Sequence, residues 1–178
     1  MTRQVALLRG INVGKNNRIA MADLRGLLES LGYDDVRTHL MSGNAIFSTT
    51  KAAKVVEAEI ERGLDKHLCP GIKVAVRTRS QLAKVIDSNP LPEHAKDGSK
   101  FLVIFLSATP ARRVLAEIDP ADFAPEQFRA ARREIYLWAP GGVQDSKLNK
   151  ALIKKLTGLT ATARNWNTVT KLLELAAG

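Results

Sequence analysis

The spacing of the apolar residues in the first part of the chain switches repeatedly between the period of a strand and that of a helix. Val5-Ala6-Leu7-Leu8 is continuously apolar, as a strand buried on both faces would be. The predicted segments are a strand at 5–8, a helix at 21–31, strands at 36–41 and 45–49, a helix at 56–68 and a strand at 72–76. This β-α-β-β-α-β order is the signature of a ferredoxin-like fold.

The second part of the chain repeats this order. The predicted segments are a strand at 101–106, a short helix at 110–118, a hairpin of 127–131 with 135–139, a helix at 146–157, a strand at 160–163 and a closing helix at 167–176. A helix at 80–87 and the loop NPLPEHAKDGSK, which has the composition of a linker, lie between the two parts. We therefore expect an α+β protein with antiparallel sheets: an N-terminal ferredoxin-like half at 1–79, a helix and linker at 80–99, and a C-terminal ferredoxin-like half with its closing helix at 100–178.

The composition of the chain indicates the cellular compartment in which we expect it. Its 178 residues, 45% of them hydrophobic, are sufficient for a buried core. The single cysteine, Cys69, cannot form an internal disulfide, which fits a reducing compartment. The longest strongly apolar stretch is Phe101–Leu106, far short of the roughly 20 residues of a membrane helix, and Val5–Leu8 is too short for a signal peptide. We expect a cytoplasmic protein without a membrane partner.

The net charge of +9 favours anionic partners. Residues 1–22 and 146–173 contain no acidic side chain. These stretches are either solvated basic surfaces or two parts of one anion-binding face, and the sequence leaves both interpretations open.

The loop RGINVGKNNR at 9–18 joins a predicted buried strand to a helix, where backbone N–H groups often converge on an anion. It does not match the ATP-binding pattern GxxxxGK[ST], because only three residues separate Gly10 from Gly14 and Asn16 replaces the magnesium-binding hydroxyl. An ATPase is therefore disfavoured. The structural alternative is that glycines and asparagines serve tight turns with left-handed backbone conformations.

Two further polar motifs stand out. Ser42-Gly43-Asn44 is typical of a hairpin turn, and its functional interest depends on the turn lying near the first loop. Arg164-Asn165-Trp166-Asn167-Thr168 precedes the closing helix, where an asparagine can cap the helix and Trp166 can anchor it. Alternatively, Arg164 and the helix N-terminus hold a phosphate or carboxylate while Trp166 stacks on a planar group.

Conventional catalytic sets are absent from the sequence. His39, His67 and His94 are scattered, no pair has the spacing of metal ligands, and Cys69 has no recognisable partner. We expect neither a metal nor a cofactor, and the sequence does not decide whether the protein is an enzyme.

The segment VALLRGINVGKNNRIAMADLRGLLESLGYDDVRTHLMSGNAIFS, together with TARNWNTVTKLLELA near the end, resembles the bacterial domain-of-unknown-function family 1697. The resemblance rests on the combination of the motifs RGINVG, SGN and TxRNWNT, and it extends over essentially the whole chain. One departure is Lys15, where the family usually has a second glycine. The resemblance implies a two-part α+β fold of the ferredoxin-like kind and no assigned activity.

We hypothesise a binding module for an anionic, phosphate-bearing ligand, either a nucleotide or another small phosphorylated molecule, or a nucleic acid. Its three motifs are expected to lie on one face. The candidate ligand-binding residues are Arg9, Gly10, Asn12, Gly14, Lys15, Ser42, Gly43, Asn44, Arg164, Asn165, Trp166 and Asn167. RNA binding by base stacking on central strands is disfavoured, because Phe47 is the only aromatic residue in VALLRG and NAIFS.

Two alternatives remain. The spacing of Gly10, Gly14 and Arg18 is similar to that of the phosphate loop of acylphosphatases, which would make the chain a small phosphohydrolase with Asn44 positioning a water. The other alternative is a structural or interaction protein without a ligand. The sequence does not indicate the oligomeric state.

Overall fold

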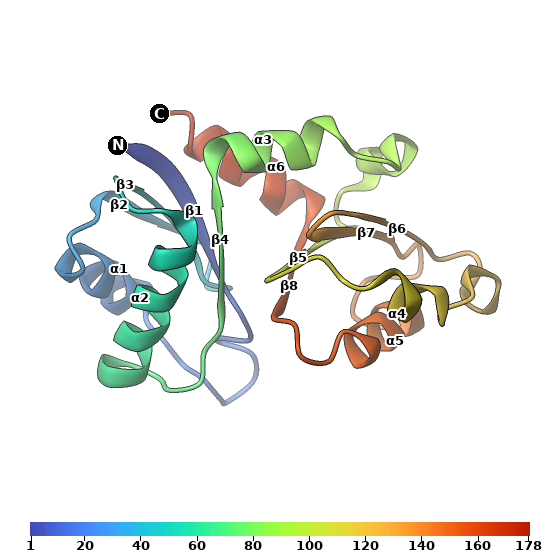
Figure 1. Ribbon diagram of the computed structural model, residues 1–178, viewed down its shortest axis with the longest axis horizontal. Helices are drawn as coiled ribbons and strands as arrows, with labels where there is room; N and C mark the ends of the chain where they lie inside the picture. Colours follow the sequence, from blue (N-terminus) through green and yellow to red (C-terminus); the bar gives the residue numbers. More distant parts are fainter. The chain divides into compact units, whose positions relative to one another are not determined.

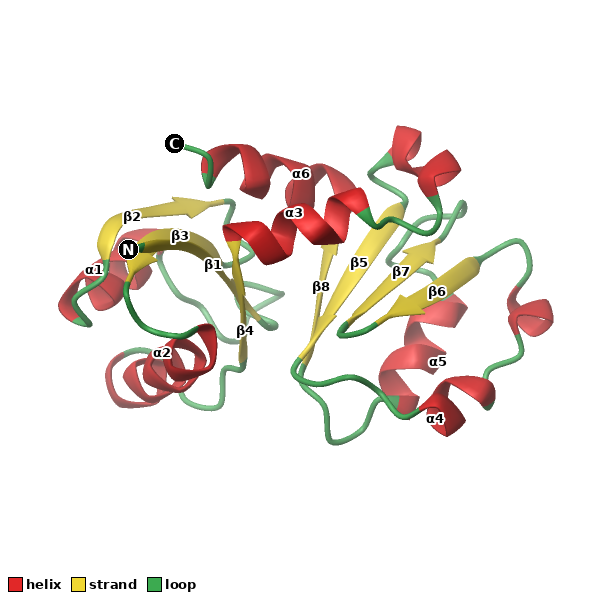
Figure 2. Ribbon diagram, turned by 45° about the horizontal axis from the view of Figure 1, so that its top comes forward, coloured by secondary structure: helices red, strands yellow, loops and turns green.

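The computed structural model describes residues 1–178 and divides them into two compact units. The first unit comprises Met1–Lys84 and Lys171–Gly178, and the second comprises Val85–Thr170. Each unit contains one four-stranded antiparallel sheet with the β-α-β-β-α-β arrangement (Figures 1 and 2). The predicted α+β fold class with two ferredoxin-like halves is therefore confirmed.

The first sheet has the strand order β2-β3-β1-β4, with β1 in its interior. Its strands are β1 (Thr2–Leu8), β2 (Asp34–His39), β3 (Asn44–Thr49) and β4 (Val74–Thr78). Helices α1 (Met21–Ser30) and α2 (Ala53–His67) pack on one face of this sheet. Because side chains alternate along a strand, Ala6 and Leu8 face these helices while Val5 and Leu7, which are also buried, face the other side.

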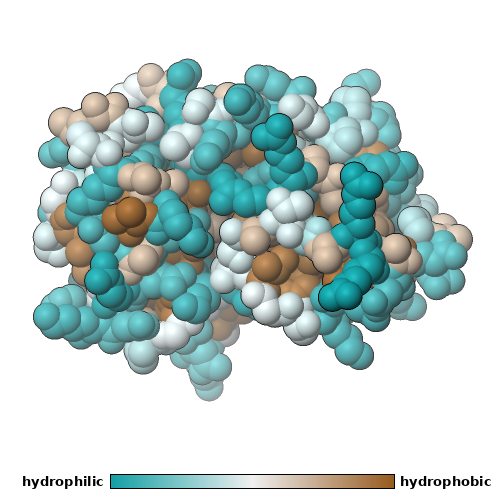
Figure 3. All heavy atoms as spheres, viewed as in Figure 1, coloured by the Kyte–Doolittle hydropathy of each residue, from teal (hydrophilic) through white to brown (hydrophobic).

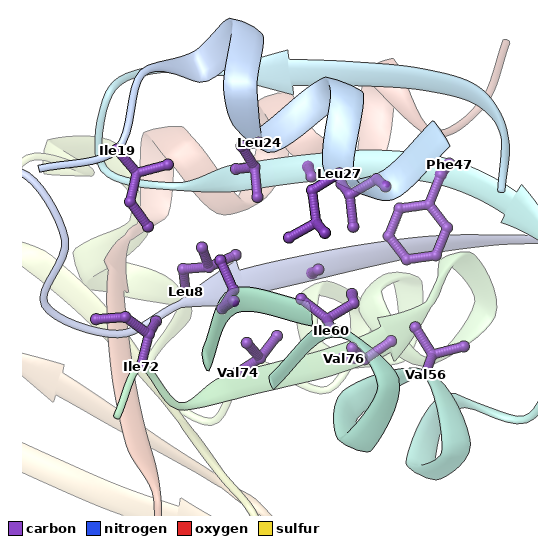
Figure 4. Packing of buried hydrophobic residues seen from close by; sticks show 14 of the residues in the cluster. Leu8, Ile19, Leu24, Leu27, Phe47, Val56, Ile60, Ile72, Val74 and Val76 are labelled. Atoms are coloured by element: carbon purple, nitrogen blue, oxygen red, sulfur yellow. The ribbon is translucent and has the colours of Figure 1, made fainter. Parts of the chain in front are cut away.

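The core of the first unit follows from the helical spacing seen in the sequence. Leu24, Leu27 and Leu28 of α1 are at most 7% exposed and lie over the sheet. Ile60 of α2 contributes from the neighbouring helix, and Figure 4 shows Leu24, Leu27 and Ile60 converging with side chains of the strands. At the edge of this core the Tyr33 ring stacks on Phe47 with a centroid distance of 4.7 Å.

The Tyr33 hydroxyl donates a 2.7 Å hydrogen bond to Glu59 Oε2, which Lys51 Nζ contacts at 2.8 Å. Burial, followed by the hydrogen bond to Glu59, raises the pKa of Tyr33 well above its ordinary value. The hydrogen bond from Lys51 lowers the pKa of Glu59. This chain of contacts joins the segment after α1 to helix α2.

The second sheet has the strand order β6-β7-β5-β8. Its strands are β5 (Phe101–Leu106), β6 (Gln127–Ala131), β7 (Glu134–Trp138) and β8 (Ala161–Asn165). Helices α4 (Arg112–Ala116) and α5 (Lys147–Lys155) pack on one face through the hydrophobic cluster that contains Ile104, Leu148 and Leu152. Helix α5 begins at an N-cap, Ser146, whose Oγ accepts a 2.9 Å hydrogen bond from Asn149 N–H.

Four further helical segments complete the chain, one of which is the short 3₁₀ helix η2 (Pro120–Phe123) between α4 and β6. Helix α3 (Arg79–Asp87) and the 3₁₀ helix η1 (Pro92–Asp97) lie in the segment between β4 and β5, where the sequence predicted one helix and a linker. Helix α6 (Trp166–Leu175) begins in the second unit, and its last residues belong to the first. None of the helices combines the length and the apolarity that crossing a membrane requires. On the face drawn in Figure 3, hydrophilic side chains surround small apolar patches.

The packing of α2 gives a first prediction. Ile60 is 0% exposed, so replacing it with alanine leaves a cavity between α2 and the sheet. Ile60→Ala should lower the free energy of unfolding by about 2–5 kcal/mol. Urea denaturation measures this change.

Val55→Ala is the matched control, because Val55 lies on the same helix and is 49% exposed. It should change the free energy of unfolding by about 0.5 kcal/mol or less. Equal effects of the two substitutions would contradict the packing described for α2.

Candidate ligand-binding surface

The loop that follows β1 is built from left-handed backbone conformations. Gly10 has φ 64°, Asn12 54°, Gly14 62° and Asn17 51°. Glycine adopts this region without strain and asparagine tolerates it better than other side chains do. The predicted role of these residues in tight turns is therefore confirmed.

The carboxamide of Asn12 ties the two ends of this loop together. Its Oδ1 accepts a 2.9 Å hydrogen bond from Ile19 N–H, and its Nδ2 donates one of 2.9 Å to Ile19 O. The same Nδ2 donates a 2.8 Å hydrogen bond to Met41 O, in the turn between β2 and β3. The Asn12 backbone N–H donates to Asn17 O at 3.0 Å. Asn12 is thus a structural residue that couples the loop to the turn.

Other contacts fix the remainder of the loop. Asn17 Nδ2 donates a 3.2 Å hydrogen bond to Gly10 O, and Cys69 Sγ lies 3.5 Å from Asn17 Oδ1. Ile11 and Ile19 are 2% and 3% exposed and anchor the loop in the core. The asparagines that the sequence singled out therefore hold the backbone in place.

Gly43 brings the second motif against the first. It has φ 80°, and a Cβ atom there would lie 2.6 Å from Ile11 Cδ1 and 2.9 Å from Leu8 Cβ. No larger residue fits without moving this part of the loop. A functional role of Ser42-Gly43-Asn44 required that its turn lie near the first loop. The turn does lie beside that loop.

Asn44, the last residue of this motif, is fully buried. Its Nδ2 donates hydrogen bonds of 2.8 Å to His39 O and 3.1 Å to Ser42 Oγ. The Asn44 carboxamide thus closes the turn between β2 and β3.

The third motif lies in the second unit, where β8 ends and α6 begins. Asn165 Oδ1 accepts a 2.9 Å hydrogen bond from Thr168 N–H, which is the predicted cap. Trp166 is 7% exposed, and its ring centroid lies 5.2 Å from that of Phe101, so its predicted anchoring role is confirmed as well. Asn167 is exposed and approaches Gly98, where a Cβ would lie 2.1 Å from its Oδ1. A common face for all three motifs stays a prediction.

Arg164 is 8% exposed, on strand β8 opposite Val103. Its Nη1 donates a 2.8 Å hydrogen bond to Ala163 O. Burial lowers the pKa of Arg164 to about 10, so the guanidinium is charged at neutral pH.

The first unit places Arg77 in the equivalent position, which the sequence reasoning missed. Arg77 lies opposite Val5 on β4, is 1% exposed, and donates from Nη1 to Val76 O at 3.0 Å. Leu8, the last residue of β1, pairs with Val74, and Arg77 follows three residues later. Leu106, the last residue of β5, pairs with Ala161, and Arg164 likewise follows three residues later. The sequence signal that could have revealed this pair is an arginine within the last strand of each sheet, β4 and β8.

Positive charge without a carboxylate partner gathers on the first loop. Arg9, Lys15 and Arg18 are exposed, and Arg18 makes only a 3.5 Å contact from Nη2 to Gly14 O. Arg9 and Lys15 form no ion pair, whereas the lysines near α2 are paired. The paired lysines are Lys51 with Glu59, Lys54 with Glu57 and Lys73 with Glu61.

Exposed apolar side chains accompany these charges. Val13 is 70% exposed, Leu40 54% and Met41 64%. Leu40 also has φ 60°, a conformation that is strained for a bulky residue. We call residues 9–18 and 40–43 together the loop–turn surface. No group of three or more His, Cys, Asp or Glu side chains is placed to hold a metal ion.

Fold and surface define an α+β protein with two ferredoxin-like units and a basic, asparagine-braced loop after its first strand. The family described as "Protein of unknown function (DUF1697)" matches residues 1–136, and the chain belongs to this family. The match includes the first two motifs and ends before Arg164–Thr168.

One solved structure, that of the conserved bacterial protein SP0830 from Streptococcus pneumoniae, resembles the chain along its whole length. The TM-score is 0.82 at 24% sequence identity, and the similarity covers 100% of this chain and 99% of that one. This likeness supports the fold alone. No curated protein matches the chain.

The close approach at Gly43 gives a second prediction. Gly43→Ala imposes a positive φ on alanine and drives its Cβ into Ile11. Gly14→Ala is the matched control, since Gly14 has a similar φ of 62° and no atom within 4 Å of its Cβ position. Gly14→Ala should destabilise the protein by about 1–2 kcal/mol, the cost of the backbone conformation.

Gly43→Ala should cost about 1–3 kcal/mol more, because overpacking adds to the backbone term. Chemical denaturation of both variants measures the difference. If Gly43→Ala were no more destabilising than Gly14→Ala, the loop would not rest on the turn.

Proposed function

We propose that the chain binds a phosphate-bearing ligand, a nucleic-acid backbone in particular, on the loop–turn surface. The observation that carries this proposal is the set of exposed cations, Arg9, Lys15 and Arg18, that no carboxylate neutralises. Arginine and lysine side chains are the usual partners of phosphate oxygens.

The brace formed by Asn12 supports the proposal. The hydrogen bonds of Asn12 to Ile19 and Met41 fix the backbone that carries Arg9 and Lys15. A ligand therefore does not have to order the loop, and this lowers the entropic cost of binding.

The openness of the surface favours a nucleic acid over an isolated nucleotide. Small-ligand sites bury most of their ligand, whereas Val13 and Met41 are 70% and 64% exposed. A polyanion needs no enclosure, because several phosphates share the positive charge.

No observation favours the phosphohydrolase alternative. Asn44, the residue that would position a water, is 0% exposed, and its Nδ2 donates to His39 O and Ser42 Oγ. Its carboxamide is engaged in closing the turn. The proposal also leaves Arg164 aside, because a side chain that is 8% exposed displays little of its charge on the surface.

The third prediction tests this function. The double variant Arg9→Gln/Lys15→Gln should bind a fluorescent single-stranded oligonucleotide about tenfold more weakly at low salt, and the slope of log K against log salt should fall by about 2. Fluorescence anisotropy at several salt concentrations provides both quantities. Free mononucleotide should compete poorly.

The control is Lys54→Gln/Lys84→Gln, which removes the same charge from exposed positions on α2 and α3. It should leave the affinity nearly unchanged. If both double variants weakened binding equally, the interaction would depend only on the net charge of the protein. If no oligonucleotide bound at low salt, the chain would not be a nucleic-acid-binding protein.

A further inference from the structure

A second polar site lies in the first unit, away from the motifs of the sequence. It is a cavity of about 350 Å³. Its lining includes Arg3, Asp35, Arg37, Ser48 and Arg79, and residues 176–178 complete the wall. We call it the arginine pocket. Every one of these residues belongs to the first unit.

Arg3 is the least exposed of the three arginines that line this pocket. Its side chain is 14% exposed, and Nη1 donates to Asp35 O at 3.1 Å and to Ser48 Oγ at 3.2 Å. Arg3 and Ser48 are opposite each other in the β1–β3 ladder, so their side chains lie on the same face. The Nε and Nη2 atoms of Arg3 are buried and have no hydrogen-bond partner. A buried guanidinium N–H group without a partner is costly, and the chain itself supplies no further acceptor for these two atoms.

An irregularity in β2 shapes the pocket. The register of β2 against β3 shifts between Asp34 and Arg37, and Asp35 has φ 50°. Irregularities of this kind redirect side chains at the edge of a sheet. Arg37 stands at the end of the shifted segment and lines the same cavity as Asp35.

The charges in the pocket are not balanced. Arg37 and Arg79 are exposed and form no ion pair. The one acidic side chain, Asp35, is 75% exposed, and its Oδ2 lies 3.9 Å from Arg3 Nη1. Three guanidinium groups outnumber Asp35 and the terminal carboxylate of Gly178, so the pocket keeps an excess of positive charge that favours an anionic group.

We infer that the arginine pocket binds a small phosphorylated molecule through its phosphate group. Arginine matches phosphate geometry with paired N–H donors, and three arginines surround the cavity. The volume of about 350 Å³ lies within the range of small-ligand sites. This site is independent of the loop–turn surface, since the two share no residue.

Isothermal titration of the full-length protein with glycerol 3-phosphate, with glycerol as the uncharged control, tests the inference. The phosphate ester should bind saturably with one-to-one stoichiometry and glycerol should not bind. Arg37→Gln and Arg79→Gln alter exposed side chains, so both variants should remain folded, and each should weaken binding by about tenfold or more. Binding should also weaken as the pH falls below about 6, where the phosphate loses its second charge.

Two controls separate this site from the other basic surface. Lys54→Gln should not change the affinity, and neither should Arg9→Gln/Lys15→Gln. The inference is overturned if glycerol 3-phosphate shows no saturable binding, or if Lys54→Gln weakens binding as much as Arg37→Gln does. If Arg9→Gln/Lys15→Gln weakened binding as much as Arg37→Gln does, the inference would also be overturned, because the phosphate ester would then bind at the loop–turn surface.

Discussion

The carboxamide of Asn12 is the contact on which the basic surface of the first unit depends. It bonds to both backbone groups of Ile19 and to Met41 O, so one side chain joins the two ends of a loop and a turn from another part of the sheet. Gly43 completes this junction, because only a glycine lets the turn rest on Ile11. The exposed cations Arg9 and Lys15 consequently project from a backbone that is already ordered.

The arginines of this molecule have two roles, one for buried side chains and one for exposed side chains. Arg77 and Arg164 occupy equivalent places in the two sheets, are nearly fully buried, and each donates to the carbonyl oxygen of the preceding residue. Arg9, Arg37 and Arg79 are exposed and have no carboxylate partner. The first pair belongs to the framework of the ferredoxin-like units, and the second set provides the charge on which both binding proposals rest.

The sequence predicted the fold because apolar periodicity reports burial locally, as in Val5–Leu8 and in Leu24, Leu27 and Leu28. It also offered left-handed turns as one of two interpretations of Gly10, Asn12 and Gly14, and the backbone angles agree with it. The partner of Asn12 was beyond prediction, since Met41 lies 29 residues away and contributes a backbone oxygen. The arginine pocket was equally hidden, because it depends on a register shift in β2 that the pattern of apolar residues does not encode.

The most direct test of the account is a titration of the ¹⁵N-labelled protein with a single-stranded oligonucleotide, followed by amide chemical shifts. The braced loop–turn surface should respond first, with the largest changes at residues 9–18 and 40–43 and little change in β6 and β7 (Figure 1). Asn12→Ala should weaken binding although no charge is lost, because the loop is no longer fixed. The largest changes in the second unit, or an unaltered affinity of Asn12→Ala, would contradict the account.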